Sequence, residues 1–243
     1  MNIVLLYETD LERPGRYVVR DRRALHIRDV LNKKDGDEIR VGLADGPLGT
    51  GRVRHVLANE IELDVSVSGW APMPWFDLVV AIPRPKMLKR IAAMVSAMGM
   101  RELHLIRSWR VQRQFLSSPA LDERTLTPFF EDGLMQGGWT VVPRLKRWTR
   151  FNEWTAHEAD APPEGTRLIA HPGARLDLVD VPPSSVHVPV RLAIGPEGGF
   201  LDEEVERAES VGYLAVRSGR STLRTDAACV AILAQLDMLL RRH

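Results

Sequence analysis

The sequence has little cysteine and no long apolar run. Cys229 is the single cysteine among 243 residues, which excludes an internal disulfide framework and a cysteine-ligated zinc or iron–sulfur site. No apolar stretch approaches the roughly 20 residues that a membrane span needs, and residues 1–8 show no basic lead before an apolar run. We therefore expect a protein of the reducing cytoplasm that is neither exported nor membrane-spanning.

An excess of charge of one sign is also missing. The chain has 33 Lys and Arg against 32 Asp and Glu, a formal net charge of +1, so its overall electrostatics do not favour a nucleic acid as partner. Only the middle third is cationic, with 13 basic and 9 acidic residues between positions 76 and 160. The 7 histidines never recur at the spacing of metal ligands, so we expect no metal.

Residues 1–72 and 73–243 differ in pattern, and we place a domain boundary between them. The first part has short strands separated by turn residues, and residues 60–67 alternate between apolar and polar positions as a half-buried strand does. This part is predicted to be a small β-barrel or sandwich. Residues 69–74 then bring a glycine and two prolines, which interrupt the pattern.

Beyond this break, strands alternate with helices, which predicts an α/β domain with a parallel sheet. Residues 76–82 are almost wholly apolar, as expected of a parallel strand covered on both faces. Residues 144–165 show no clear pattern. The other predicted elements are helices at 86–98 and 225–240, a helical segment that ends near residue 137, and strands at 103–106, 166–170, 190–194 and 213–216.

Loops follow the last three predicted strands, where the carboxyl ends of parallel strands collect ligands. The second loop has three glycines and a proline in residues 195–199, which lets its backbone approach a ligand closely, although a tight strand-to-helix turn explains the same residues. After the third loop, Thr225 and Asp226 suit the start of a helix. Arg224 gains nothing from the helix dipole, which favours a salt bridge or an anionic ligand at this position.

Two motifs in these loops are similar to those of a known family. The first, Ile194-Gly195-Pro196-Glu197-Gly198-Gly199, resembles the family's glycine-rich motif. The second, Leu223-Arg224-Thr225-Asp226-Ala227-Ala228, resembles its arginine-threonine-acid-small motif, with Asp in place of the usual Glu. With weaker support from residues 26–31 and from Arg107-Ser108, almost the whole chain resembles the bacterial 16S ribosomal RNA uridine-N3 methyltransferases, the small-subunit methyltransferase E family of the SPOUT superfamily.

The resemblance implies a fold, a cofactor and partners. The fold is α/β, with a SPOUT-type trefoil-knot domain preceded by a small PUA-like β-barrel that binds RNA. The activity is transfer of a methyl group from S-adenosyl-L-methionine to N3 of a uridine in the decoding region of 16S ribosomal RNA, either as naked RNA or in the assembled small subunit, by a homodimer. By position, the cofactor-binding residues are Ala170, His171, Pro172, Gly173, Ile194, Gly195, Pro196, Glu197, Gly198, Gly199, Gly219, Leu223, Arg224 and Thr225.

The implied chemistry assigns a role to Arg224. Uridine N3 carries a proton near neutral pH, and this proton must leave when the methyl group arrives. We expect Arg224 to be catalytic, because a permanent cation stabilises the uracil anion or holds a flanking phosphate. Glu197 and Asp226 are alternatives for the proton acceptor, although an acid at the start of a helix usually has a lowered pKa. The sequence does not decide which residue accepts the proton.

RNA contacts are expected where arginines alternate with an indole in the cationic middle segment. Such residues bind the RNA backbone and stack a base, and a solvated basic face is the alternative interpretation. The expected RNA-binding residues are Arg107, Trp109, Arg110 and Arg113 in this segment, and Arg22, Arg23 and Arg28 in the first domain.

Some positions depart from the family pattern. The segment Met135-Gln136-Gly137-Gly138-Trp139 lacks an acid and an arginine that are usual in the family, and Val95 and Met98 replace a Lys and a Glu. The cofactor motifs therefore match better than the substrate motifs. A non-catalytic RNA-binding paralogue and a SPOUT methyltransferase with a different RNA target are the alternatives. An unrelated nucleotide-binding α/β enzyme is a further one, against which stand the missing G-x-G-x-x-G, Walker and G-x-S-x-G motifs.

Overall fold

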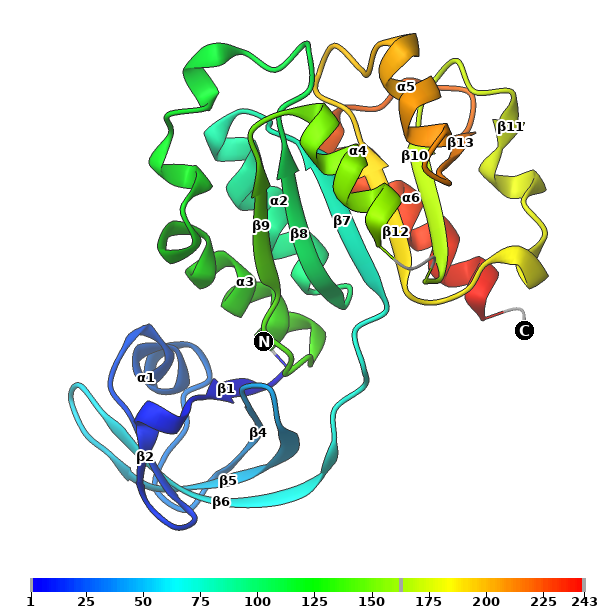
Figure 1. Cartoon of the computed structure of the whole chain (residues 1–243). Coiled ribbons are helices and arrows are strands. Elements are labelled where there is room, and N and C mark those ends of the chain that lie inside the picture. The colour runs from blue at the N-terminus through cyan, green and yellow to red at the C-terminus, as the bar shows by residue number, and fades with distance from the viewer. Residues whose placement is uncertain (1, 162–163, 242–243) are drawn as a thin grey trace. The chain divides into compact units, whose positions relative to one another are not determined.

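The computed structural model describes residues 2–161 and 164–241, which belong to two compact units (Figure 1). The first unit consists of Met1–Met73 with Glu131–Val142, and the second of Pro74–Phe130 with Pro143–His243. The chain leaves the first unit one residue beyond the boundary expected at residue 72. The sequence did not indicate that residues 131–142 group with the first unit.

The first unit is built on a curled six-stranded sheet. In sheet order its strands are β1 (Val4–Leu6), β4 (Glu38–Leu43), β5 (Pro47–Val56), β6 (Ile61–Trp70), β3 (Arg16–Val19) and β2 (Leu11–Arg13). Strands β1 and β4 are parallel, and the other neighbours are antiparallel. Because β1 and β2 are the two edges, the sheet is a half-barrel and not a closed barrel. Its helical segments include α1 (Arg22–Leu25) and a π-turn at His26–Val30.

The segment that departs from the family pattern has a structural role in the first unit. It includes the end of helix α3 (Glu123–Gly137). The carbonyl oxygen of Met135 accepts hydrogen bonds from the backbone N–H groups of Asn2 (2.8 Å) and Ile3 (3.1 Å). Leu134 and Met135 are buried together with Leu5 of β1. The segment therefore fixes the start of the first strand.

The second unit contains a seven-stranded sheet in which all neighbours are parallel. In sheet order its strands are β11 (Leu176–Asp177), β13 (Leu214–Arg217), β10 (Thr166–Ala170), β12 (Val190–Ile194), β7 (Phe76–Ala81), β8 (Met100–Ile106) and β9 (Arg144–Trp148). Every residue of β7 is buried, which confirms the prediction of a strand covered on both faces.

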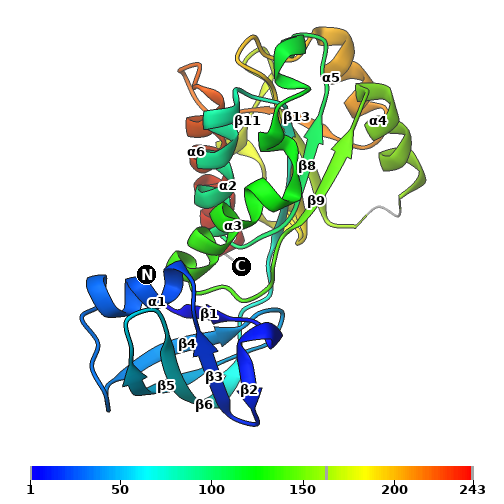
Figure 2. The same ribbon diagram turned by 90° about the vertical axis from the view of Figure 1, so that its left-hand side faces the viewer.

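Helices cover both faces of this sheet (Figure 2). On one face lie α2 (Pro85–Ser96) and α6 (Thr225–Leu240), and on the other α4 (Phe151–Asp160) and α5 (Asp202–Glu209). Val95 on α2 is fully buried, so an apolar residue is required there. Short 3-10 turns occur at Glu8–Asp10, Arg113–Phe115, Pro119–Leu121, Leu178–Asp180 and Pro183–Ser185. None of the helices in the described ranges combines the length and apolar character of a membrane span.

A buried ion-pair network occupies the amino ends of the parallel strands. The carboxylate of Asp77, on β7, lies 2.7 Å from Arg101 and 3.0 Å from Arg191. Glu158, on α4, pairs with Arg191 at 2.8 Å and accepts a hydrogen bond from the Tyr213 hydroxyl at 3.0 Å. Both carboxylates are completely buried. Burial raises the pKa of Tyr213 above its usual value, and the negative charge of Glu158 raises it further.

Candidate functional site

Three loops converge at the opposite, carboxyl edge of the sheet. They follow β10, β12 and β13 and enclose a cavity of about 160 Å³, which we call the glycine-loop cavity. The backbone N–H of His171 donates to the Val216 carbonyl at 2.9 Å, which joins the first loop to β13. The Thr225 hydroxyl donates to the Gly195 carbonyl at 3.4 Å, which joins the second loop to the start of α6. Parallel strand order therefore brings together residues that are up to 62 positions apart in the sequence, from Ala170 to Ile232.

The second loop folds into a tight turn that requires glycine. The backbone N–H of Gly199 donates to the Pro196 carbonyl at 2.8 Å, and Gly199 has a φ of +73°. A Cβ atom on Gly195 would lie only 3.0 Å from the Phe200 backbone nitrogen, so a larger residue would displace the backbone. The loop thus presents main-chain atoms to the cavity.

Most of the expected cofactor-binding residues line the glycine-loop cavity. They are Ala170, His171, Pro172, Ile194, Gly195, Pro196, Glu197, Gly199, Gly219, Leu223 and Thr225. Gly173, Gly198 and Arg224 do not line it. A Cβ atom on Gly173 would meet the His171 ring at 2.9 Å, and one on Gly198 would meet Arg110 Cδ at 3.0 Å. These two glycines therefore permit side-chain packing behind the loops.

Sequence reasoning missed several residues of this cavity. They are Val216, Arg217, Ser218, Arg220, Ser221, Thr222, Ala228 and Ile232. A signal existed for two of them, because Ala228 and Ile232 are four residues apart and thus lie on the same face of α6, one turn from Arg224.

The charged residues at this edge fall into paired and unpaired groups. Asp226 has a side chain that is 5% exposed, lies 3.2 Å from Arg90, and does not line the cavity. Glu197 lines it and lies 3.7 Å from Arg84. Arg224 precedes α6 and is exposed, and its side chain has no hydrogen bond or ion pair with any described residue. Glu197 is the acid that lines the cavity. Two arginines without a partner among the described residues lie at this edge, Arg224 beside the cavity and Arg220 in its lining.

Cys229, the single cysteine, belongs to the core. Its side chain is fully buried on α6. Burial, together with the nearby Asp226 carboxylate, raises the pKa of the thiol to about 12, so the thiol is uncharged at neutral pH.

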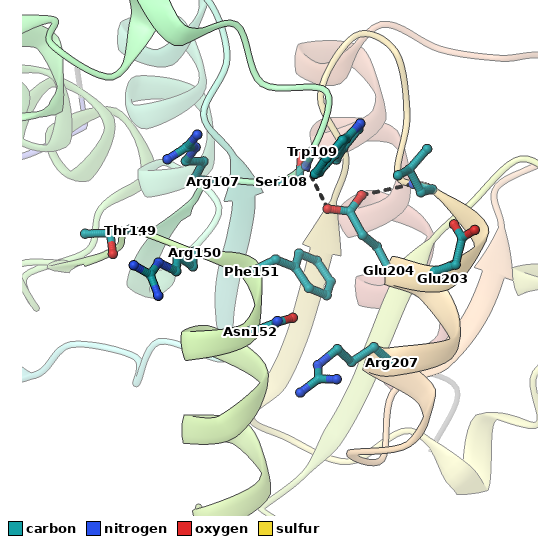
Figure 3. A pocket seen from close by; sticks show the side chains of 11 residues that line it. Arg107, Ser108, Trp109, Thr149, Arg150, Phe151, Asn152, Glu203, Glu204 and Arg207 are labelled. Carbon is teal, nitrogen blue, oxygen red and sulfur yellow. Dashed lines mark hydrogen bonds between the residues drawn. The ribbon is translucent and has the colours of Figure 1, made fainter.

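Arg107 and Trp109 line a second, larger cavity at the same edge of the sheet (Figure 3). It measures about 690 Å³ and lies between the loop after β8, the start of α4 and helix α5. We call it the arginine cavity. Arg110 packs over Gly198 and donates a hydrogen bond to its carbonyl oxygen. Arg113 is exposed in a 3-10 turn. Of the four residues expected to bind RNA in this segment, Arg107 and Trp109 therefore share a cavity, and Arg110 and Arg113 lie outside it.

The arginines expected to bind RNA in the first unit are held by acidic neighbours. Arg23 is only 5% exposed, and its guanidinium donates to Asp10 (2.7 Å), to Asp21 (2.8 Å) and to the Leu5 carbonyl. This burial corrects the expectation for Arg23, whose donors are committed within the fold. Arg22 pairs with Glu131 at 2.6 Å and with Asp132.

Arg28 is similarly engaged, because it pairs with Asp29 at 2.5 Å and donates to the Ala58 carbonyl. Arg22 and Arg28 keep part of their surface in solvent, with side chains 41% and 33% exposed. RNA would therefore have to displace or bridge an existing carboxylate to bind either residue.

The described residues contain no group of three or more His, Cys, Asp and Glu side chains placed to hold a metal ion. The chemistry of this edge is that of main-chain amides and carbonyls, small apolar side chains and arginines. Such a donor set suits neutral nucleoside edges and phosphates.

Comparisons with known proteins agree with this chemistry. The family model described as RNA methyltransferase domain matches residues 71–237. The ribosomal RNA small subunit methyltransferase E of Treponema pallidum is 28% identical over 246 residues, which cover 96% of this chain and 91% of the relative. The ribosomal RNA small subunit methyltransferase E 1 of Borreliella burgdorferi is 21% identical over 87% of both chains.

A solved structure shows the same fold. The ribosomal RNA small subunit methyltransferase E of Neisseria gonorrhoeae, bound to S-adenosylmethionine, matches with a TM-score of 0.77 and 19% identity, over 98% of both chains. The likeness confirms the predicted fold class, a SPOUT-type α/β domain preceded by a small β domain.

Proposed function

The chain belongs to the small-subunit ribosomal RNA methyltransferase E family, and from this membership we propose that it methylates N3 of a uridine in 16S ribosomal RNA, with S-adenosylmethionine as the methyl donor. The observation that carries the proposal is the glycine-loop cavity, where the two family motifs and the loop after β10 meet. Motifs that are distant in the sequence lie around one cavity, as a shared ligand requires.

The cavity has the chemistry that the cofactor requires. The side chains of Ile194, Val216 and Ile232 provide apolar surface for the adenine ring, and the tight turn at Gly195 and Gly199 exposes main-chain groups for its polar edge. A volume of about 160 Å³ encloses only part of a nucleoside, since ligand pockets usually span about 300–1,000 Å³. The rest of the cofactor would lie over the exposed loop at residues 218–224. When bound, the cofactor supplies an electrophilic methyl group on sulfur.

Arg224 and Glu197 are the residues that we assign to the substrate. Arg224 has no partner among the described residues and precedes a helix, where the dipole repels a cation, so its position is explained by an anionic ligand. Its guanidinium would stabilise the uracil anion that forms as the N3 proton leaves. Glu197 is the acid that lines the cavity, and we assign proton acceptance to it in preference to the buried, paired Asp226.

The partners follow from the same proposal. The RNA substrate is 16S ribosomal RNA, free or in the assembled small subunit, and the enzyme works as a homodimer. Light scattering of the purified protein tests the dimer, because a mass near 27.3 kDa would mean a monomer and contradict this part of the proposal.

The substrate is tested by mass spectrometry of 16S ribosomal RNA from a strain that lacks this protein. We expect N3-methyluridine to disappear and to return when the gene is restored. Retention of this nucleoside in the deletion strain would overturn the substrate assignment, and loss of a methyl group elsewhere would favour a different RNA target.

The catalytic role of Arg224 is tested by Arg224→Ala. Loss of one donor to a developing anion typically lowers turnover by about 100-fold or more, so methyl transfer should fall by this factor. Cofactor affinity, measured by calorimetry, should change little because Arg224 does not line the cavity.

Arg175→Ala is the matched control, since Arg175 is another exposed arginine of the second unit that lines neither cavity. Equal turnover of the two variants would remove the role from Arg224.

A further inference from the structure

The arginine cavity is separate from the glycine-loop cavity and shares no lining residue with it. Figure 3 shows Arg107 and Arg150 on one side of Phe151 and Arg207 on the other. The loop after β8, the junction of β9 and α4, and the start of α5 supply its walls. Its volume of about 690 Å³ is within the range of small-molecule sites.

Its charge favours an anion. The guanidinium of Arg107 has no hydrogen bond or ion pair in the described part of the chain. Arg207 donates only to the Thr155 hydroxyl, at 3.2 Å, and Arg150 lies 3.8 Å from Glu153 with both side chains exposed. Weak pairs of this kind do not neutralise a cation.

The acidic residues of the cavity are engaged or peripheral. Glu204 accepts hydrogen bonds from the backbone N–H groups of Trp109 (2.8 Å) and Leu201 (3.0 Å), which occupies both carboxylate oxygens. Glu203 is exposed at the start of α5. Positive charge therefore dominates inside the cavity.

The start of α4 contributes one wall of the cavity. Arg150 precedes the helix without a capping side-chain hydrogen bond, and residues 149–152 line the cavity. The Glu153 carboxylate turns back to accept from the Thr149 hydroxyl at 2.6 Å. This carboxylate lies in the first turn of α4, where it offsets part of the positive end of the helix dipole, so the positive charge of the cavity comes from its arginines.

Ser108 supplies an independent sign of a ligand. It lines the cavity and is only 2% exposed, and its Oγ atom has no hydrogen-bond partner within residues 2–161 and 164–241. A buried hydroxyl without a partner is unfavourable, and native proteins usually satisfy such groups. A phosphate oxygen or a base edge in the cavity would supply the missing partner.

Trp109 completes the recognition chemistry. Its indole is 82% exposed, although the hydrogen bond of its backbone to Glu204 fixes its position beside the cavity. Aromatic rings held next to arginines are how proteins bind unpaired nucleotides, because the ring stacks on the base and the cations hold the phosphate. A free exposed indole is costly to hydrate and is explained by such stacking.

We propose that the arginine cavity binds one unpaired nucleotide of the RNA substrate that flanks the methylated uridine. Its base stacks on Trp109, and its phosphate lies near Arg107 and Arg150, with the Ser108 hydroxyl as a hydrogen-bond partner. This rests on the proposed function for the identity of the RNA, and the cavity would orient the strand for the glycine-loop cavity.

Fluorescence anisotropy with a labelled single-stranded RNA of the target sequence tests the proposal. Trp109→Ala should weaken binding by about tenfold, as loss of one stacked base does, and Trp109→Phe should restore most of the affinity. Arg107→Ala should weaken binding and reduce its dependence on salt. Arg124→Ala is the control, since Arg124 is an exposed arginine of the second unit outside both cavities.

Ser108→Ala separates ligand binding from a structural role. Removal of an unsatisfied buried hydroxyl should leave the free energy of unfolding unchanged or slightly higher, while RNA affinity falls. A loss of stability with unchanged affinity would show that Ser108 is structural and would contradict the proposal.

Two further arms identify the occupant and separate this proposal from the proposed function. Uridine monophosphate and inorganic phosphate should compete only weakly with the RNA, and full competition by either would mean a small-molecule site and overturn the RNA assignment. Calorimetry with S-adenosylmethionine should give the same affinity in all five variants, the control included. If Trp109→Ala and Arg107→Ala bind RNA as Arg124→Ala does while methyl transfer persists, the cavity proposal fails alone. If cavity variants lose RNA binding in a protein that does not methylate 16S RNA, only the proposed function fails.

Discussion

The two ends of the parallel sheet use arginine in opposite ways. At the amino end, Arg101 and Arg191 are paired with the completely buried carboxylates of Asp77 and Glu158. At the carboxyl end, Arg107 and Arg224 are exposed and have no partner among the described residues. Arginine side chains are thus paired with buried carboxylates at one end of the sheet. At the other end they are exposed, where an anion can reach them.

The difference follows from the local backbone. Asp77 and Arg191 are the second residues of β7 and β12 and face each other across these neighbouring strands, so their positions within regular strands hold them in place. At the carboxyl end the strands leave into glycine and polar loops, where side chains reach solvent. The buried ion pairs therefore lie at one end of the sheet, and the cavities for which we propose ligands lie at the other.

The largest effect is expected from breaking the amino-end network. Glu158→Ala removes a buried carboxylate and leaves the positive charge of Arg191 partly uncompensated. The free energy of unfolding should therefore fall by about 3–5 kcal/mol. Urea denaturation measures this change. Cofactor affinity of the folded variant should remain unchanged, because Glu158 is remote from the glycine-loop cavity lining.

Asp160→Ala on the same helix is the control, since Asp160 is exposed. Its effect should stay within about 0.5 kcal/mol. Equal stability of the two variants would contradict a stabilising role for the network.

A smaller effect, confined to the carboxyl end, is expected from Ala170→Leu. The added methyl groups fill part of the glycine-loop cavity, and overpacking of this kind costs about 1–3 kcal/mol, so S-adenosylmethionine affinity should fall by about tenfold or more. Calorimetry measures this fall. Ala156→Leu, at an exposed position on α4, is the control and should bind the cofactor normally. Normal binding by both variants would show that the cofactor lies elsewhere.

The smallest effect concerns pH and a carboxylate near the amino end of β8. Hydrogen bonding to His104 (2.9 Å) and pairing with Lys146 (2.8 Å) hold the pKa of Glu102 well below its usual value of about 4.3. The unfolded chain therefore binds a proton at a higher pH than the folded protein, so stability falls as pH drops below about 4.3. Denaturation curves between neutral and acid pH should show this loss.

Glu102→Gln should lose less stability than the unaltered protein as the pH falls below about 4.3, because the variant has no carboxylate to protonate. Glu123→Gln, at an exposed position, should lose as much stability in acid as the unaltered protein does. If Glu102→Gln loses stability with falling pH as steeply as the unaltered protein, other groups cause the loss.

The regular elements were largely predictable from the sequence. The apolar run of β7 and the helix at Thr225–Leu240 were found at their observed positions, because burial on both faces and apolar periodicity leave direct signals. Residues 144–165 gave no such signal. They contain β9, an edge strand whose residues are half-buried or exposed, and α4, in which buried and exposed residues alternate irregularly.

The candidate site was predictable in part. Loop residues such as Gly195 and Thr225 were identified by their motifs, and both line the glycine-loop cavity. Arg150 and Phe151 of the arginine cavity were missed, since they lie in the segment without a clear pattern. Arg23 was expected on a surface, but an arginine and its buried partner Asp10 look like any other charged pair in the sequence.

By itself, the sequence determined the fold class, the motifs of the family and the need for glycine where the backbone turns sharply, because these depend on local residue chemistry and on periodicity. Only the tertiary structure decided which arginines are paired and which are free, and which loops share a cavity. The physical reason is that pairing and enclosure depend on distances between residues far apart in the chain, and strand order in the sheet sets those distances.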